Sequence, residues 1–212
     1  MASQQKRIIY WDVDDVVLNT SETIIQLIND DFRIPNNIKD KSIKDLKDWK
    51  MQSIYRPLPK NYIYDIIEDD RFWSTVRFNN GFIKLISSPE ARYFQHYFVT
   101  IGSEANLKKK NEVLCKNLQY VMSLNDDYEF IGLLPNSEKH IVNMEGEIQI
   151  DDNLKNLVNT NAGLKILLKN NLETDYNTYS KFKPIDNLYE VNTLQEVYEI
   201  ITFILNNPGV IL

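Results

Sequence analysis

Ile8-Ile9-Tyr10-Trp11-Asp12-Val13-Asp14-Asp15-Val16-Val17 is the stretch of sequence that decides the fold, because an apolar run ends there in acidic residues. An apolar run without polar alternation is typical of a strand covered on both faces, as in the middle of a parallel sheet. Ligands of open α/β sheets bind at the carboxyl ends of such strands. Asp12 and Asp14 lie two positions apart, so they face the same side where the chain stays extended. We therefore expect both carboxylates to serve one site at the edge of the sheet.

A second acidic cluster follows an apolar segment later in the chain, at Ile148-Gln149-Ile150-Asp151-Asp152. Carboxylates that crowd together repel one another unless a cation or a shared proton relieves the crowding. Carboxylate oxygens are the ligands that Mg²⁺ takes in proteins. The two clusters together predict an oxygen-ligand cation site, most simply one for Mg²⁺.

Length and composition bound the class of protein. The 212 residues, 43% of them hydrophobic, suit one large domain, or one domain with a small insertion, around a filled core. The net charge of −6 argues against an extended nucleic-acid footprint but leaves room for a local basic pocket. Cys115 is the single cysteine, and with His96 and His140 it makes no zinc-binding spacing. No targeting signal is visible and no apolar run approaches the ~20 residues of a membrane span, so we expect a cytoplasmic protein without a membrane contact.

Strands and helices are expected to alternate along the chain. The patterns predict strands at 7–12, 93–100, 129–133, 147–150 and 164–169, and helices at 21–32, at 81–87, from 104, and from 194 to 205. Thr20 or Ser21 is the expected cap of the first helix, and Ser103 caps the helix after the second strand. Thr193 and Glu196 form a capping-box pattern at the last helix. This alternation predicts an α/β core with a mostly parallel sheet.

An insertion is expected between the first helix and the second strand. The two are separated by about 60 residues, whereas a βα loop takes ~2–6 and a parallel crossover only a dozen or more. The surplus predicts a small helical cap at 36–79, inserted into a core formed by 1–35 and 80–212. The cap segment holds several aromatic residues, including Trp49, Phe72 and Trp73.

The polar residues at the predicted strand and helix ends come in an order that resembles the haloacid dehalogenase (HAD) superfamily of phosphohydrolases. Its Asp-x-Asp motif is matched by Asp12-Val13-Asp14, and its strand ending in Thr by Tyr97-Phe98-Val99-Thr100. Its Lys at a helix start is matched by Ser137-Glu138-Lys139-His140, and its acidic pair by Asp151-Asp152. Four motifs in order are a specific pattern. The resemblance implies a doubly wound, mostly parallel, Rossmann-like sheet of the HAD type.

Within that superfamily the chain resembles the 5′(3′)-deoxyribonucleotidases in size, in the early cap, and in an acidic pair that follows Ile. Asp45-Leu46-Lys47-Asp48-Trp49 is similar to the start of the cap in bacterial and phage members. One departure is Asp15, where many relatives carry Gly, which adds a third acid beside the metal. Another is Ile101-Gly102-Ser103, where some relatives carry Ser-Pro after the Thr. The resemblance implies a cytoplasmic hydrolase of deoxynucleoside monophosphates.

The resemblance and the chemistry together assign roles to the acids. Asp12 is the expected nucleophile, which splits the reaction through an aspartyl-phosphate. Asp14 is expected to protonate the leaving oxygen and then to accept a proton from water. Mg²⁺ is expected on Asp12, the backbone carbonyl of Asp14 and Asp152, with Asp151 either a ligand or a partner of one.

The other expected site residues bind the phosphate and the leaving group. Thr100, Ile101 and Lys139 are expected to contact the phosphoryl oxygens, and Mg²⁺ neutralises them together with Lys139. Trp49, and after it Trp73, are candidates for stacking on a base. Lys108-Lys109-Lys110 is the rival of Lys139, but a run of three charges on a helix is typical of a solvated face.

Each of these residues also has a plainer interpretation, and other classes of protein remain open. A single Asp-x-Asp is more often a cap or a loop, Thr100 alone an ordinary strand end, and Trp49 and Trp73 the core of a cap. A phosphoacceptor receiver domain is disfavoured because its acidic pair comes first and a separate acceptor Asp precedes its Thr. A non-catalytic phospholigand-binding protein on the same fold, and a HAD phosphatase of another small metabolite or of a polynucleotide 3′-phosphate, are the alternatives. A homodimer through the last helix is also open.

Overall fold

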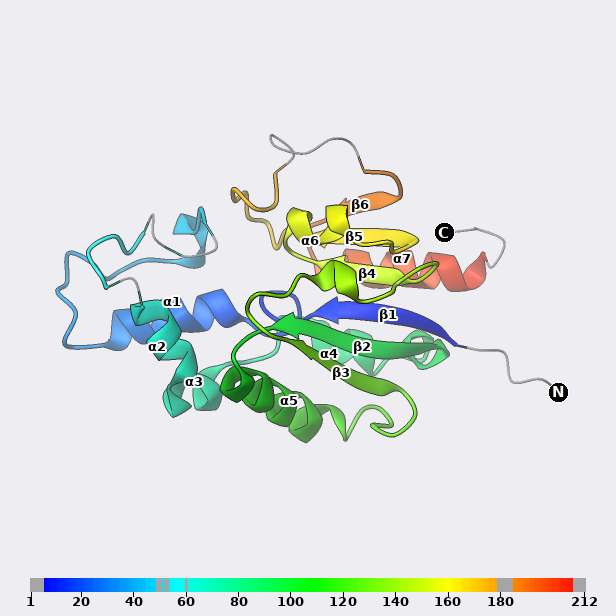
Figure 1. Cartoon of the computed structure of the whole chain (residues 1–212), viewed down its shortest axis with the longest axis horizontal. Coiled ribbons are helices and arrows are strands. Elements are labelled where there is room, and N and C mark those ends of the chain that lie inside the picture. Colours follow the sequence, from blue (N-terminus) through cyan, green and yellow to red (C-terminus); the bar gives the residue numbers. More distant parts are fainter. Residues whose placement is uncertain (1–5, 49–50, 52–53, 60, 179–184, 208–212) are drawn as a thin grey trace.

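A six-stranded sheet forms the centre of the molecule in the computed structural model, which describes residues 6–48, 51, 54–59, 61–178 and 185–207 (Figure 1). The strand order is β3-β2-β1-β4-β5-β6, and every neighbouring pair is parallel. The strands are β1 (Arg7–Asp12), β2 (Phe94–Ile101), β3 (Tyr128–Leu133), β4 (Ile148–Asp151), β5 (Leu164–Leu168) and β6 (Leu188–Val191). The predicted α/β sheet is confirmed, and β6 is one strand more than the sequence patterns indicated.

The central strand β1 is buried on both faces, as its apolar run predicts. Ile9 and Trp11 point to one face and pack in the main core with Phe82, whereas Tyr10 points to the other face and packs with Met144. Neighbouring side chains on a strand alternate between the two faces of a sheet, and both faces here are covered. This is the doubly wound arrangement, with β1 in the interior of the sheet.

Helices flank the sheet, and the helices within residues 20–75 lie beyond the carboxyl ends of its central strands (Figure 1). The α-helices are α1 (Thr20–Asp30), α2 (Tyr62–Glu68), α3 (Asp70–Thr75), α4 (Phe82–Ile86), α5 (Glu104–Leu118), α6 (Leu154–Asn159) and α7 (Leu194–Asn206). Short 3₁₀ turns are η1 (Ile43–Asp45), η2 (Glu90–Tyr93) and η3 (Lys139–Ile141). No helix among the described residues is long and apolar enough to cross a membrane.

Two of the three predicted helix caps are confirmed. Ser103 accepts a hydrogen bond from the backbone of Asn106 at the start of α5, and Thr193 and Glu196 form the capping box of α7. The prediction for α1 is wrong, because this helix begins at Thr20 with Asn19 before it and has no side-chain cap bond. The apolar face of α7 is buried within the chain.

The segment 36–79 contains η1, α2 and α3, and it lies on the side toward which the arrowheads of β1 and β2 point (Figure 1). Several contacts join it to the rest of the chain, and two of them reach α5 and the loop after β5. Asp70 pairs with Lys109 of α5 at 3.1 Å, and the carbonyl of Lys47 accepts a hydrogen bond from the backbone of Asp175 at 3.0 Å. These contacts hold the segment against the carboxyl edge of the sheet.

Candidate active site

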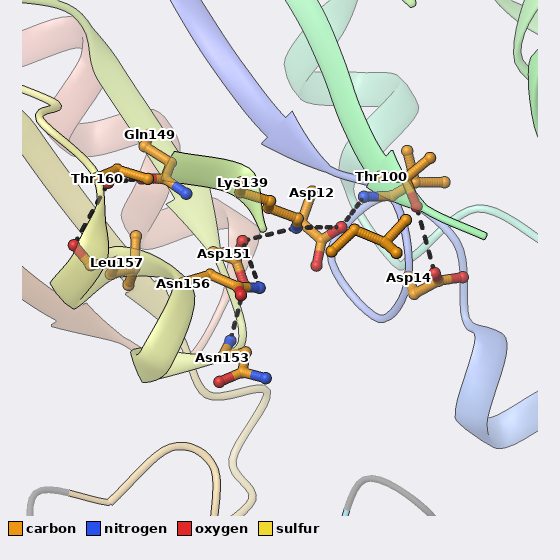
Figure 2. Close-up of polar contacts among 12 residues, drawn as sticks. Asp12, Asp14, Thr100, Lys139, Gln149, Asp151, Asn153, Asn156, Leu157 and Thr160 are labelled. Atoms are coloured by element: carbon orange, nitrogen blue, oxygen red, sulfur yellow. Dashed lines mark hydrogen bonds and ion pairs between the residues drawn. The ribbon is translucent and has the colours of Figure 1, made fainter. Parts of the chain in front are cut away.

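The register of the sheet brings the polar strand ends together. Asp12 is the last residue of β1 and lies opposite Val99, one residue before Thr100 of β2. On the other side of β1, Trp11 is opposite Ile150, so Asp151 follows at the end of β4. Parallel strands in this register end at one edge, where Figure 2 shows Asp12, Asp14, Thr100 and Asp151 as neighbours.

Lys139 lies between the two acidic clusters and pairs with both. Its Nζ is 2.7 Å from Asp12 Oδ1 and 2.7 Å from Asp151 Oδ2, as Figure 2 shows, and its side chain is buried. Burial opposes the charge of the ammonium, but Asp12 and Asp151 outweigh this opposition and raise the pKa of Lys139. Lys139 is therefore a cation that bridges the ends of β1 and β4.

Asp12 has one engaged oxygen and one free oxygen. Oδ1 accepts hydrogen bonds from the backbone of Val13 at 2.6 Å and from Lys139, whereas no hydrogen bond or ion pair among the described residues reaches Oδ2. Burial, with Asp151 and Asp14 adding to it and Lys139 opposing it, raises the pKa of Asp12 to about 7. The geometry leaves Oδ2 available to attack a bound group.

Asp152 is the carboxylate of the site that lacks partners in the described part of the chain. Both of its oxygens are buried without a hydrogen bond, and burial, with Asp12 and Asp151 adding to it, raises its pKa well above the usual value. One oxygen each of Asp12, Asp151 and Asp152 lies within 4.8 Å of the others. A buried carboxylate without partners is costly, and three carboxylates this close repel one another, so a divalent cation fits this cluster.

Asp151 differs from Asp152 because its oxygens are already engaged. They accept hydrogen bonds from Lys139, from the backbone of Asn153 at 2.9 Å, and from Asn156 at 3.0 and 3.2 Å (Figure 2). These three donors fix the orientation of the Asp151 carboxylate. The two adjacent acids therefore differ in their surroundings.

Lys110 is part of the site, and its prediction as part of a solvated helix face is wrong. It is 2% exposed, its Nζ pairs with Asp14 Oδ2, and it donates to Thr100 Oγ1 at 2.7 Å and to the carbonyl of Ile101 at 3.4 Å. The signal in the sequence was the spacing, because the buried stripe of α5 recurs every four residues. That stripe consists of Asn106, Lys110, Leu114 and Leu118.

Asp14 lies across the turn from Asp12 and faces Thr100. Its carboxylate accepts hydrogen bonds from Thr20 at 2.8 Å and, more weakly, from Thr100 at 3.4 Å, beside the pair with Lys110. The site therefore has two cationic side chains with separate partners. Lys139 pairs with Asp12 on the β4 side. Lys110 pairs with Asp14 and donates to Thr100 on the β2 side.

Asp15 is turned toward α1. Its carboxylate accepts hydrogen bonds from the backbone of Ser21 at 2.8 Å and from the hydroxyl of Ser21, and burial raises its pKa to about 6. It therefore satisfies a donor in the first turn of α1, which Thr20 and Ser21 were expected to cap. Its backbone is left-handed, with φ of 57°, a conformation that Gly adopts at no steric cost.

The other predicted pocket residues are placed only in part. Ile101 ends β2 and is half-buried, with its carbonyl toward Lys110. Trp73 lies in α3, half-buried and edge-to-face against Phe72 with ring centroids 4.9 Å apart. Trp49 lies outside the described residues.

A family model and several solved structures are similar to this chain. The family described as "5′ nucleotidase, deoxy (Pyrimidine), cytosolic type C protein" matches residues 6–206. No curated protein sequence matches the chain.

Solved structures with this fold include three phosphatases or hydrolases. A predicted phosphatase from Clostridium acetobutylicum is 16% identical with a TM-score of 0.56, over 94% of this chain and 100% of its own. The putative HAD-hydrolase YfnB from Bacillus subtilis, bound to magnesium, is 15% identical with a TM-score of 0.56, over 93% and 99%. The D,D-heptose 1,7-bisphosphate phosphatase from B. bronchiseptica, complexed with magnesium and phosphate, is 12% identical with a TM-score of 0.51, over 93% and 98%. At these identities the likeness is one of fold.

Proposed function

We propose, from the premise that this chain belongs to the 5′-nucleotidase, deoxy (pyrimidine), cytosolic type C family, that it hydrolyses deoxynucleoside monophosphates with the help of Mg²⁺. Membership of that family makes the chain a phosphoric monoester hydrolase, and its sheet has the HAD fold. The observation that carries the proposal is the buried carboxylate of Asp152, which has no hydrogen-bond partner among the residues described and lies close to Asp12.

Asp12 is the nucleophile in this proposal. Its Oδ2 attacks the phosphorus, the bond from phosphorus to the leaving oxygen breaks, and an aspartyl-phosphate forms. Lys139 holds Oδ1 and so fixes the rotation of the carboxylate, which keeps the attacking oxygen in line. Water then attacks the phosphorus, inorganic phosphate leaves, and the Asp12 carboxylate is restored.

Asp14 moves the protons of both steps. It protonates the leaving oxygen as the ester bond breaks, and it takes a proton from the water that attacks next. Asp14 is hydrogen-bonded to Thr20, the first residue of α1, and this bond orients its carboxylate. Its position across the turn from Asp12 suits a group that protonates the leaving oxygen while Asp12 attacks the phosphorus.

The phosphoryl oxygens are proposed to lie toward β2. Thr100 donates from its hydroxyl, Ile101 contributes its backbone, and Lys110 supplies charge from α5. Lys110 is paired with Asp14, so a bound phosphoryl group takes over part of that ion pair and frees Asp14 for proton transfer. Lys139 adds positive charge on the opposite side, next to Asp12.

The metal ligands are proposed to be Asp12, Asp152 and the backbone carbonyl of Asp14. Asp151 supports them through its bonds to Lys139 and Asn156, or acts as a further ligand. Bound Mg²⁺ supplies charge neutralisation for the phosphoryl group and for the crowded carboxylates. The unpartnered oxygens of Asp152 are the part of the site that this ion would satisfy.

The substrate is proposed to lie between a core of residues 1–35 and 80–212 and a cap of residues 36–79. The contacts of Asp70 with Lys109 and of Lys47 with Asp175 support a cap that rests on the edge of the core. Such a cap closes over the leaving group and excludes water from the reaction. Trp73, with Trp49 in the same segment, remains the candidate for stacking on the base.

We expect phosphate release to be fastest from deoxynucleoside monophosphates. Loss of base stacking costs ~1–3 kcal/mol, so kcat/KM for sugar phosphates should be lower by roughly 10–100-fold. The measurement is phosphate release across deoxynucleotides, ribonucleotides, sugar phosphates and 3′-phosphorylated oligonucleotides. The Asp12→Asn variant, purified in parallel, controls for a contaminating phosphatase. A preference for a sugar phosphate or for a polynucleotide 3′ end would instead support the alternative substrates.

We also expect Mg²⁺ to stabilise the protein more as the pH rises. Burial raises the pKa of Asp12 to about 7 and that of Asp15 to about 6, against an unfolded value of about 4. The metal-free folded state therefore holds more protons than the unfolded state between about pH 4 and 7, and its stability falls as the pH rises through that window. Mg²⁺ competes with those protons, so the gain in Tm on adding Mg²⁺ should be small near pH 5 and larger near pH 8.

The difference in Tm with and without Mg²⁺ is the quantity to measure, because other groups also titrate. Burial lowers the pKa of His96 to about 4, which makes its contribution to stability rise with pH, but it is the same with and without the metal. Asp152→Ala should remove most of the gain at every pH. A gain in Tm that is constant between about pH 5 and 8 would contradict the expectation that the metal displaces protons from these acids.

A further inference from the structure

Two asparagine side chains from distant parts of the chain converge on the turn between β1 and α1. Nδ2 of Asn170, in the loop after β5, donates to the backbone carbonyl of Asp15 at 2.6 Å. Nδ2 of Asn79, just before α4, reaches the same carbonyl at 3.2 Å, the carbonyl of Val16 at 3.3 Å, and Oδ1 of Asn170 at 3.2 Å. The two amides form a linked pair on one backbone oxygen.

The residue they hold has an unfavourable backbone conformation. Asp15 has a φ of 57°, which is uncommon for a residue with a side chain. Its carboxylate is fixed by the backbone and hydroxyl of Ser21, and its carbonyl by Asn170 and Asn79. A conformation of this kind persists only where the surroundings hold it from several sides.

The conformation of Asp15 determines the direction of the carbonyl of Asp14. The carbonyl of Asp14 and the amide of Asp15 belong to one planar peptide group. That amide donates to the carbonyl of Leu18 at 2.8 Å, within a tight turn that runs back to Val13. If Asp15 left the left-handed region, this peptide plane would rotate, and the carbonyl of Asp14 with it.

We propose that Asn170 and Asn79 are positioning residues that fix the carbonyl of Asp14 for Mg²⁺ by holding Asp15 in its left-handed conformation. The proposal rests on the proposed function, which places the metal on that carbonyl. Within the described part of the chain neither asparagine hydrogen-bonds to Asp12, Asp14 or Asp152, so both act through Asp15.

The position of the pair supports this role. Asn170 and Asn79 line a cavity of about 290 Å³ whose wall also includes Asp15 and Asp152. The amide pair therefore shares a cavity wall with the carboxylate whose two buried oxygens have no hydrogen-bond partner in the described part of the chain. A contact that orients a ligand from outside typically changes metal affinity by about 10–100-fold when it is lost.

The sharpest test compares Asn170→Gly with Asn171→Gly. Both residues are left-handed, with φ of 51° and 58°, so Gly removes either side chain without backbone strain. Asn171 is exposed, and no side-chain hydrogen bond is found for it among the described residues, so it is the matched control. Titration calorimetry of the full chain with MgCl₂ should show Kd raised by roughly 10-fold in Asn170→Gly and unchanged in Asn171→Gly.

Kinetics should separate positioning from a loss of substrate binding. The Mg²⁺ concentration for half-maximal activity should rise in Asn170→Gly by the same factor as Kd, while KM for the phosphate ester at saturating Mg²⁺ stays within about twofold of wild type. Asn79→Ala should give a smaller rise in Kd, because Asn170 keeps the shorter bond to Asp15.

Two results would overturn the proposal. One is an Mg²⁺ Kd within about twofold of wild type in folded Asn170→Gly, and the other is an equal weakening in both glycine variants. If Asn170→Gly does not fold, Asn79→Ala decides by the same criterion. Wild-type protein that neither binds nor requires Mg²⁺ would refute the proposed function itself, and that titration is measured first.

Discussion

Replacement of Asp12 by Asn is expected to lower kcat by roughly 10³-fold or more. The variant lacks the nucleophile that forms the covalent intermediate, and no other group replaces it. The amide keeps the shape of the side chain and can still accept the hydrogen bond from Val13. It cannot attack phosphorus as the carboxylate does. The measurement is phosphate release from a deoxynucleotide and from p-nitrophenyl phosphate, together with the melting temperature of both proteins.

The matched control is Asp14→Asn, which should leave the nucleophile intact. Without the proton shuttle, activity should fall strongly for a nucleoside leaving group, and less for p-nitrophenol, which departs with little protonation. Asp12→Asn should lose activity equally on both substrates. Folded Asp12→Asn with most of its activity left would reject the aspartyl-phosphate route. Equal losses on both substrates in Asp14→Asn would assign Asp14 to the metal or the fold instead of the proton.

The sheet could be predicted from the sequence because its signal is local. The apolar run before Asp12 occupies a strand that is buried on both faces, and burial of that kind leaves no polar alternation. The strand before Asp151 is also buried throughout, although Gln149 interrupts its apolar residues. The caps at Ser103 and Thr193 are equally local, since cap and helix lie within one turn. Strand β6 was missed because its two middle residues are exposed and its residues form no apolar run.

The candidate site was predictable at the strand ends and, through the family resemblance, at Lys139, but not elsewhere. Lys110 lies ten residues after Thr100, on a helix whose exposed face carries other lysines. The run of lysines therefore predicted a solvated face, and only the four-residue spacing of the buried stripe indicated that Lys110 is buried. Asn79 and Asn170 carry no local signal at all, because their common partner is the backbone of Asp15. Contacts between a side chain and a distant backbone depend on the whole fold.

Asp151 and Asp152 show the same limit at closer range. The family resemblance placed Mg²⁺ on Asp152 and left Asp151 either as a ligand or as a partner of one, and the residues alone do not decide the role of Asp151. Asp151 is held by Lys139, Asn153 and Asn156, whereas Asp152 has no hydrogen-bond partner among the described residues. This difference in environment decides which of the two is expected to depend on the metal.

Removal of Mg²⁺ by EDTA is expected to abolish activity, and readdition to restore it, because the buried carboxylate of Asp152 has no hydrogen-bond partner among the described residues and lies close to those of Asp12 and Asp151. Elemental analysis verifies that the treated protein is metal-free. Full activity of that protein would reject the metal site.

Two single variants should then differ in opposite ways in their Mg²⁺ requirement and in Tm. Asp152→Ala removes a ligand that supports nothing else, so the Mg²⁺ requirement should rise strongly, by about 10-fold or more, with little loss of Tm. Asp151→Ala leaves Lys139 with Asp12 alone and leaves Asn156 without its acceptor, so Tm should fall more and the Mg²⁺ requirement should rise less. The reverse order would mean that Asp151 binds the metal directly and that Asp152 is the supporting residue. Because the Mg²⁺ requirement and Tm are measured separately for both variants, a general loss of folding would not produce the expected result.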